Sequence, residues 1–104
     1  MDILVKIKRM AVKHQVRLTE KARNEKIRDG LRMDEILESI INAPVINKTI
    51  KSTSKHKKSK REKLYVIISP TYDGKMIYTK GTFRKENGVE EYYLFISSKW
   101  SVYE

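Results

Sequence analysis

The chain has 104 residues and contains no cysteine. This absence excludes disulfides, thiolate zinc sites and cysteine nucleophiles, and it fits a reducing compartment. No apolar run approaches the roughly 20 residues that a membrane-spanning helix needs. The first ten residues, MDILVKIKRM, are too interrupted by charge to form the apolar region of a secretory signal. We therefore expect a cytoplasmic protein with no membrane partner.

Signatures of metal and cofactor binding are also missing from the sequence. The two histidines, His14 and His56, have no metal-ligand spacing, and no acidic cluster completes a site around them. The sequence contains no glycine-rich phosphate loop, nucleophile elbow or dinucleotide fingerprint. We therefore expect no metal and no cofactor.

Positive charge is what the chain has in excess, with a net charge of +10. Residues 48–63, KTIKSTSKHKKSKREK, hold eight basic residues against one acid, a net of +7. We call these residues the basic segment. Such a cluster favours a polyanion, because each phosphate that it neutralises releases a condensed counterion. The alternative is a solvated linker that merely keeps the protein soluble.

The first half of the chain has helical periodicity. Residues 3–14 place apolar side chains at helical spacing, which predicts an amphipathic helix, and residues 15–18 read as a short extended connection. Thr19 is a candidate N-cap for a polar helix that ends at Asp29-Gly30. Apolar residues from Met33 to Ile41 predict a third helix that stops before Pro44.

The second half changes to strand periodicity. Strands are predicted at residues 45–50, 64–69, 76–84 and 89–98, and Asn87-Gly88 is a strong hairpin signal. Tight turns between successive strands favour an antiparallel arrangement. We predict one α+β domain over residues 1–104, with N-terminal helices packed on a three- to four-stranded antiparallel sheet. A basic loop at about residues 51–63 would join two strands.

Several short motifs carry a resemblance to a known family. They are Gln-Val-Arg at residues 15–17 followed by Thr19, Gly30-Leu31 before the third helix, GKMIYTK at residues 74–80, and Ile-Ser-Ser-Lys at residues 96–99. In these features the chain resembles the RelE-like superfamily of bacterial toxins, most closely the MqsR-like branch and neighbouring uncharacterised domains. Its basic stretch at residues 52–63 is longer or more basic than the resemblance implies.

The resemblance implies the toxin of a bacterial toxin-antitoxin system, an endoribonuclease (mRNA interferase) that cleaves mRNA without a metal. Its partners would be RNA, including mRNA on the ribosome, and a cognate antitoxin. Fold similarity alone does not establish such an activity. Two other hypotheses therefore stay open: a non-catalytic nucleic-acid-binding module, and an inactive toxin-like protein that binds an acidic partner.

Metal-free cleavage of RNA needs a base for the attacking 2′-hydroxyl, cations for the phosphate and an acid for the leaving oxygen. Tyr78 and Lys80 are two residues apart on one predicted strand and so share a face. The family position favours Tyr78 and Lys99 as site members, although a simple two-residue turn leaves their register open. We assign Tyr78 as acid or RNA contact, Lys80 and Lys99 as phosphate-binding cations, and Lys51, with Lys48 as its rival, as cation or base.

Other cations are assigned to RNA binding rather than to chemistry. Arg84 is a candidate for holding the RNA backbone, and His56 could act at neutral pH as an acid or base inside the basic loop. The complete set of predicted RNA-binding residues is Lys48, His56, Lys57, Lys58, Arg61 and Arg84.

Overall fold

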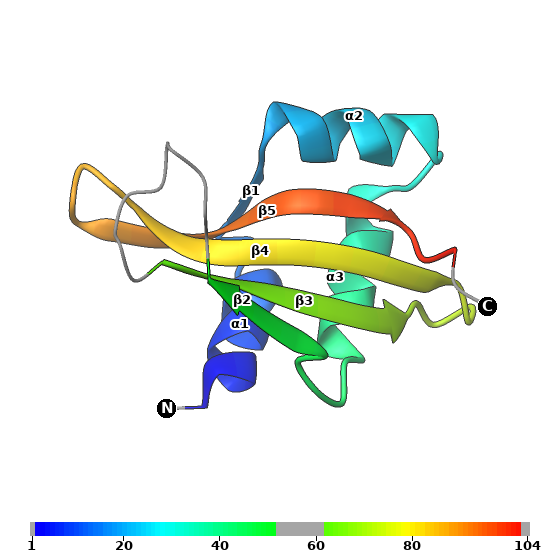
Figure 1. Cartoon of the computed structure of the whole chain (residues 1–104), viewed down its shortest axis with the longest axis horizontal. Coiled ribbons are helices and arrows are strands. Elements are labelled where there is room, and N and C mark those ends of the chain that lie inside the picture. Colours follow the sequence, from blue (N-terminus) through cyan, green and yellow to red (C-terminus); the bar gives the residue numbers. More distant parts are fainter. Residues whose placement is uncertain (1, 52–61, 103–104) are drawn as a thin grey trace.

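The computed structural model describes residues 2–51 and 62–102, and it is an α+β fold as predicted (Figure 1). Along the chain the elements are α1 (Ile3–Val12), β1 (Val16–Leu18), α2 (Glu20–Arg28), α3 (Met33–Ile41), β2 (Lys48–Lys51), β3 (Lys63–Pro70), β4 (Met76–Glu86) and β5 (Glu90–Trp100). Among these described residues, no helix is long and apolar enough to cross a membrane.

The helix ends follow from short polar signals in the sequence. Thr19 is the N-cap of α2, as predicted, and its hydroxyl accepts the amide of Ala22. The helix ends before Gly30, whose φ of 67° lies in the left-handed region that glycine adopts without strain. At the start of α3 the Glu35 carboxylate accepts the Arg32 amide, which satisfies a free donor at that helix end.

Over the described residues the sheet has five strands in the order β1-β5-β4-β3-β2, so the prediction of three to four antiparallel strands was wrong. The pairs β2–β3, β3–β4 and β4–β5 are antiparallel as expected, whereas β1 pairs with β5 in parallel. Three residues are too few to display the alternation that identifies a strand. No turn links β1 to its partner, which lies far along the chain, so residues 15–18 resemble a short extended connection.

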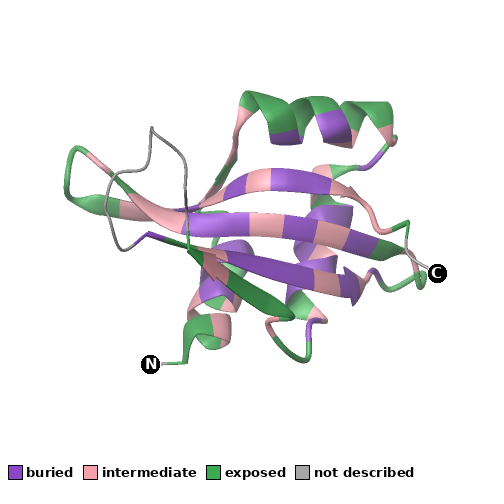
Figure 2. Cartoon of the chain, viewed as in Figure 1, coloured by how far each residue is buried: buried purple, intermediate pink, exposed green. Residues whose placement is uncertain are grey.

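The two faces of the sheet have different surroundings. Helices α1 and α3 pack behind it in Figure 1, and α2 runs along its upper edge beside β5. We call the side under α1 and α3 the covered face and the opposite side the open face. Buried and partly buried residues alternate along β4 and β5 in Figure 2, as expected when only one face is covered.

The covered face holds the hydrophobic core at the end of the sheet near α1. Ile7, Ile36 and Ile40 from the helices are fully buried against it. Four aromatic rings from three strands follow one another in edge-to-face contacts, with centroids 5.2–5.8 Å apart: Tyr65, Phe83, Tyr93 and Phe95. This cluster fixes which side of each strand faces inward.

A β-bulge divides the long β4–β5 hairpin into two registers. From Glu86↔Glu90 to Gly81↔Phe95 the pairing is continuous, and the next pair is Lys80↔Ser97. Ile96 is therefore an extra residue in β5 with no partner in β4. Since strand side chains alternate between faces, one extra residue moves every later side chain of β5 to the other face.

Candidate nucleic-acid interface

The bulge brings two predicted site residues directly opposite each other on the open face. Beyond it, Tyr78 pairs with Lys99 and, on its other side, with Ile68 of β3. The Lys99 ammonium lies 5.3 Å from the centre of the Tyr78 ring, which is a cation–π distance. Without the bulge Lys99 would be one position out of step and would face the helices.

Two further lysines occupy the next row of the same face. Lys80 pairs with Ser97 on one side and Val66 on the other, and Val66 pairs with Lys48 of β2. Lys80 lies about 7 Å along the strand from Tyr78, and Lys48 lies two strands, about 10 Å, from Lys80. The open face thus carries Tyr78 and three lysines contributed by β2, β4 and β5. We call these four residues, Lys48, Tyr78, Lys80 and Lys99, the cationic face site.

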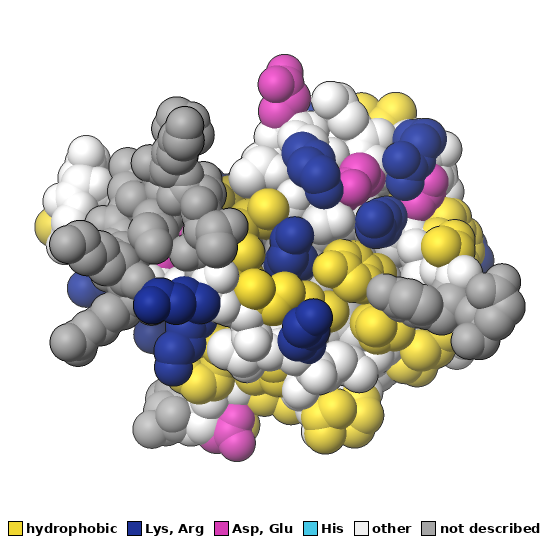
Figure 3. Space-filling model, in the orientation of Figure 1, with side chains coloured by type: hydrophobic (Ala, Val, Ile, Leu, Met, Phe, Trp, Pro, Cys, Tyr) yellow, Lys and Arg dark blue, Asp and Glu magenta, His cyan; other side chains and the backbone are white. Residues whose placement is uncertain are grey.

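The surroundings of the cationic face site are mainly apolar and basic. Leu64, Ile68 and Leu94 are half-buried residues of the same strands. Figure 3 shows this side of the molecule, with Lys and Arg side chains scattered among hydrophobic ones and acidic side chains gathered mostly near its upper edge. Amine groups above apolar surface and one phenol ring can contact phosphates and bases together.

Lys51 does not join the cationic face site. It pairs with Lys63, and the alternation along β2 puts it on the side of Thr49, which pairs with the core residue Tyr65. Lys48, named in the sequence analysis as the rival of Lys51, is the β2 lysine that shares a face with Lys80. Lys48 and Lys51 are three positions apart in β2, an odd number, so their side chains lie on opposite faces of the sheet.

Arg84 is engaged within the protein. Its guanidinium forms a two-pronged ion pair with Glu62, with Nε–Oε2 2.5 Å and a second nitrogen 3.1 Å from Oε1. The Arg84 side chain is 17% exposed and that of Glu62 is 5% exposed. An RNA phosphate would have to compete with this carboxylate. Four other predicted RNA-binding residues, His56, Lys57, Lys58 and Arg61, lie outside the described residues.

Trp100 is another residue whose side chain is engaged within the protein. Trp100 is the last residue of β5, and its indole Nε1 donates to the Asp29 carbonyl at 2.8 Å. The Lys75 ammonium lies 5.4 Å from its ring centre. These contacts hold the ring at the end of the sheet.

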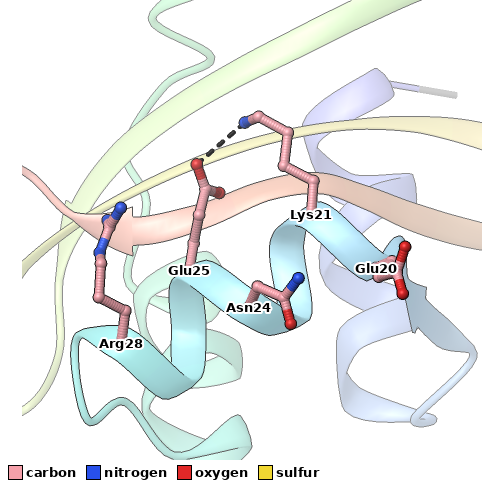
Figure 4. Close-up of a pocket in the computed structure, with 5 residues that line it drawn as sticks. All are labelled: Glu20, Lys21, Asn24, Glu25 and Arg28. Carbon is pink, nitrogen blue, oxygen red and sulfur yellow. Dashed lines mark hydrogen bonds and ion pairs between the residues drawn. The ribbon is translucent and has the colours of Figure 1, made fainter.

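Helix α2 borders the open face with a polar surface. Glu20, Lys21, Asn24, Glu25 and Arg28 line a shallow depression of about 650 Å³ there (Figure 4). Glu25 points toward β5 and pairs with Lys21 at 2.9 Å. Burial raises the pKa of the Glu25 carboxyl, but hydrogen bonds from Lys21, Ser97 and Ser98 outweigh it, so that this pKa lies below its usual value.

Two acids of this region, Glu25 and Asp29, were not predicted from the sequence as members of a site. Glu25 is a buried carboxylate in a helix whose composition is almost wholly polar, and Asp29 caps the end of that helix. The signal that could have drawn attention to them is their spacing of four residues, which places both on one side of α2. That spacing is common in exposed helices. Here the two acids matter because β5 lies beside α2 and donates backbone amides to both carboxylates.

Comparisons with known proteins leave the family open. No protein-family model, no curated protein and no solved structure matches the chain. Within the part of the chain that the structure describes, no group of three or more His, Cys, Asp or Glu side chains is placed to hold a metal ion. The geometry of the cationic face site is therefore the basis for a proposed function.

Proposed function

We propose that this protein is a RelE-like toxin of a bacterial toxin-antitoxin system, an endoribonuclease that cleaves mRNA without a metal. One observation carries the proposal: Tyr78 is directly opposite Lys99, with Lys80 and Lys48 in the next row of the same face. A phenol beside closely placed ammonium groups supplies the proton donor and the phosphate-binding charges that metal-free cleavage of RNA needs.

The proposed reaction is an internal transfer at one phosphate of single-stranded RNA. The 2′-oxygen forms a bond to phosphorus and the bond from phosphorus to the 5′-oxygen breaks, which leaves a 2′,3′-cyclic phosphate and a 5′-hydroxyl. Lys80 and Lys99 stabilise the negative charge that develops on the phosphate oxygens. Tyr78 gives its proton to the departing 5′-oxygen, and Lys48 is the candidate acceptor of the 2′-hydroxyl proton.

The test is incubation of the purified protein with a mixed single-stranded RNA in the presence of EDTA, followed by mapping of the fragment ends. We expect cyclic phosphate ends with the wild type and a loss of about 100-fold or more in Tyr78→Phe and Lys99→Ala. Tyr72→Phe and Lys13→Ala are the matched controls, because both residues are exposed and lie outside the cationic face site. Undiminished cutting by both site variants would refute the assignment.

A second candidate function is a phosphate clamp without catalysis, and a different observation favours it. Lys51 and Lys63, two lysines of the basic segment, are directly opposite each other in the β2–β3 ladder. Like charges in this position repel, and a bound phosphate would relieve the repulsion. This hypothesis predicts RNA binding that weakens steeply with salt and leaves the RNA intact. If the purified protein binds but does not cut, the same assay on translating ribosomes separates the clamp from a nuclease that needs the ribosome.

The partners and location follow from the same proposal. An acidic antitoxin fits a chain with a net charge of +10, because opposite surface charges speed and orient association. A toxin that acts on mRNA works in the cytoplasm. An inactive toxin-like protein would keep the acidic partner and lose the cleavage, so co-purification with an acidic protein together with intact RNA would indicate that alternative.

A further inference from the structure

The outer edge of β5 is covered by groups from two consecutive elements, the residues that flank β1 and helix α2 with its C-cap. Before the bulge, the Tyr93 amide donates to the Gln15 carbonyl and the Phe95 carbonyl accepts the Thr19 amide. After the bulge, the Ser98 amide donates to Glu25 Oε1 at 3.1 Å and the Trp100 amide donates to Asp29 Oδ2 at 2.8 Å. The edge groups of β5 thus belong to odd-numbered residues before Ile96 and to even-numbered residues after it.

The change from odd-numbered to even-numbered edge residues occurs at the bulge, and α2 contacts β5 at this point. Glu25 also accepts the hydroxyl of Ser97 at 2.7 Å, so one carboxylate oxygen binds two successive residues just beyond Ile96. Glu25 is only 9% exposed, and although burial raises the pKa of its carboxyl, the hydrogen bonds hold this pKa below its usual value. In a continuous register the edge amides beyond Phe95 would be those of Ser97 and Lys99, and the amides of Ser98 and Trp100 would turn toward β4.

We infer that Glu25 and Asp29 are positioning residues that select the register in which Lys99 faces Tyr78. Two carboxylates four residues apart on α2 match two amides two residues apart on β5, and only the bulged register presents these amides to the helix. In the continuous register Glu25 would keep Lys21 and Asp29 would keep Arg28, but both acids would lose their backbone donors from β5. Because a lost hydrogen bond to a charged, poorly exposed group is costly, the contacts favour the bulged register. This inference rests on the proposed function for its catalytic meaning, whereas the register itself is measurable without RNA.

The two registers make different contacts that nuclear magnetic resonance can distinguish. In the bulged register Tyr78 is opposite Lys99 and Lys80 is opposite Ser97. In the continuous register Tyr78 would be opposite Ser98, and Lys99 would be opposite Ile77. The Lys99 side chain lies over the Tyr78 ring, so its methylene protons next to the ammonium should be shifted upfield by the ring, and this shift is a second reporter.

The experiment compares the wild type with a double variant, Glu25→Ala with Asp29→Ala. We expect cross-strand contacts between Tyr78 and Lys99 in the wild type, and their weakening or replacement by Tyr78–Ser98 contacts in the double variant, with loss of the upfield shift. RNA cleavage should fall about 100-fold, because misplacement by an ångström or more has effects of that size. Glu20→Ala is the matched control, since Glu20 is an exposed acid of the same helix.

A deletion variant keeps the inference testable if the double variant is poorly folded. Removing Ile96 makes the ladder continuous while Lys99 stays opposite Tyr78 and the same amides of Ser98 and Trp100 stay on the edge. In the chain without Ile96, the substitutions at Glu25 and Asp29 should leave the Tyr78–Lys99 contacts unchanged. If the two acids merely stabilised the fold, the substitutions would disrupt these contacts with or without Ile96. Rescue of the pairing and of cleavage by this deletion is the expected result.

The outcomes separate this inference from the proposed function. Tyr78–Lys99 contacts that persist in the double variant overturn the positioning role, whatever the RNA assay gives. Loss of the contacts in the double variant and their rescue by the deletion support it, even if the wild type cuts no RNA, in which case the proposed nuclease function fails alone. Equal disruption of the pairing with and without Ile96 also overturns the inference, because the acids would then act on general stability.

Discussion

The covered and open faces of the sheet are made from the same strands but have different chemistry. On the covered face, edge-to-face aromatic rings and fully buried isoleucines form the hydrophobic core. On the open face, the same strands carry lysines, two tyrosines (Tyr78 and Tyr92) and mostly half-buried aliphatic residues. Stability and the candidate site are thus encoded at alternate positions of the same strands, so substitutions on one face should leave the other nearly unaffected.

Truncation of a core aromatic ring should give the largest effect on stability. Phe95 is fully buried, and Phe95→Ala should lower the free energy of unfolding by about 3–5 kcal/mol through lost contacts and a residual cavity. Its neighbour Leu94 is half-buried on the open face, and Leu94→Ala should cost less than half as much. Urea unfolding of both variants checks this, and equal losses would contradict the division between faces.

A smaller loss is expected where the backbone approaches an aromatic ring. A Cβ atom at Gly81 would lie 2.5 Å from the Tyr93 ring, which is closer than packed atoms tolerate. Gly81→Ala should therefore destabilise the protein by about 1–3 kcal/mol through overpacking. Thermal unfolding measures the effect. If the Tyr93 ring is the cause, Gly81→Ala should destabilise a Tyr93→Leu chain by less than it destabilises the wild type. A loss in the double variant equal to the sum of the two single losses would show that the ring is not the cause.

The acid dependence of stability should reveal the buried carboxylate of Glu35. The Arg32 amide and the Lys75 ammonium hold the pKa of Glu35 below its usual value, against the effect of burial. The native state therefore binds fewer protons than the unfolded chain as pH falls below the unfolded pKa of about 4.3, so stability is present above that pH and is lost toward the folded pKa. Glu35→Gln should flatten the decline of unfolding free energy below about pH 4.3, by at most about 1.4 kcal/mol per pH unit.

The control for this pH experiment is Asp34→Asn, since Asp34 is an exposed neighbour in α3. Urea unfolding at several pH values from 3 to 7 gives the comparison. A Glu35→Gln variant with the same pH slope as the wild type would mean that another carboxylate controls the acid limb.

Substitution of the open-face lysines should have the smallest effect on stability. Lys80→Ala and Lys99→Ala should each change the free energy of unfolding by no more than about 0.5 kcal/mol. Each should nevertheless reduce the slope of log affinity for single-stranded RNA against log salt by about 0.7, because one fewer counterion is released. Lys13→Ala, on the opposite side of the molecule in α1's C-cap, is the control, and an unchanged slope in both site variants would place the RNA elsewhere.

The sequence predicted the parts of this fold that depend on local signals. The three helices, the N-cap at Thr19 and the order of the four longer strands follow from periodicity and turn residues, and all were found. The parallel strand β1 was missed, because its evidence is a partner far along the chain rather than its own three residues.

The candidate site was predictable only as a list of residues. Tyr78 and Lys80 share a face by simple alternation, but the position of Lys99 depends on one extra residue in β5. Ile96 looks like any other strand residue in the sequence, and its effect depends on contacts with α2. The choice between Lys48 and Lys51 also needed the β2–β3 register, since a shift of one residue reverses the answer.

The pairing of β1 with β5 has a consequence for the time at which the protein becomes folded. Thr19 and Ile96, which are hydrogen-bonded, are 77 residues apart along the chain. Synthesis proceeds from the N-terminus, so β1, α2 and β4 are made before β5, the strand that contacts all three. Pairing between segments so far apart in the chain is slow to form. A nascent chain that ends before residue 90 has Tyr78 but no Lys99 opposite it. The face that we propose to bind RNA is therefore completed only after β5, residues 90–100, has been synthesised.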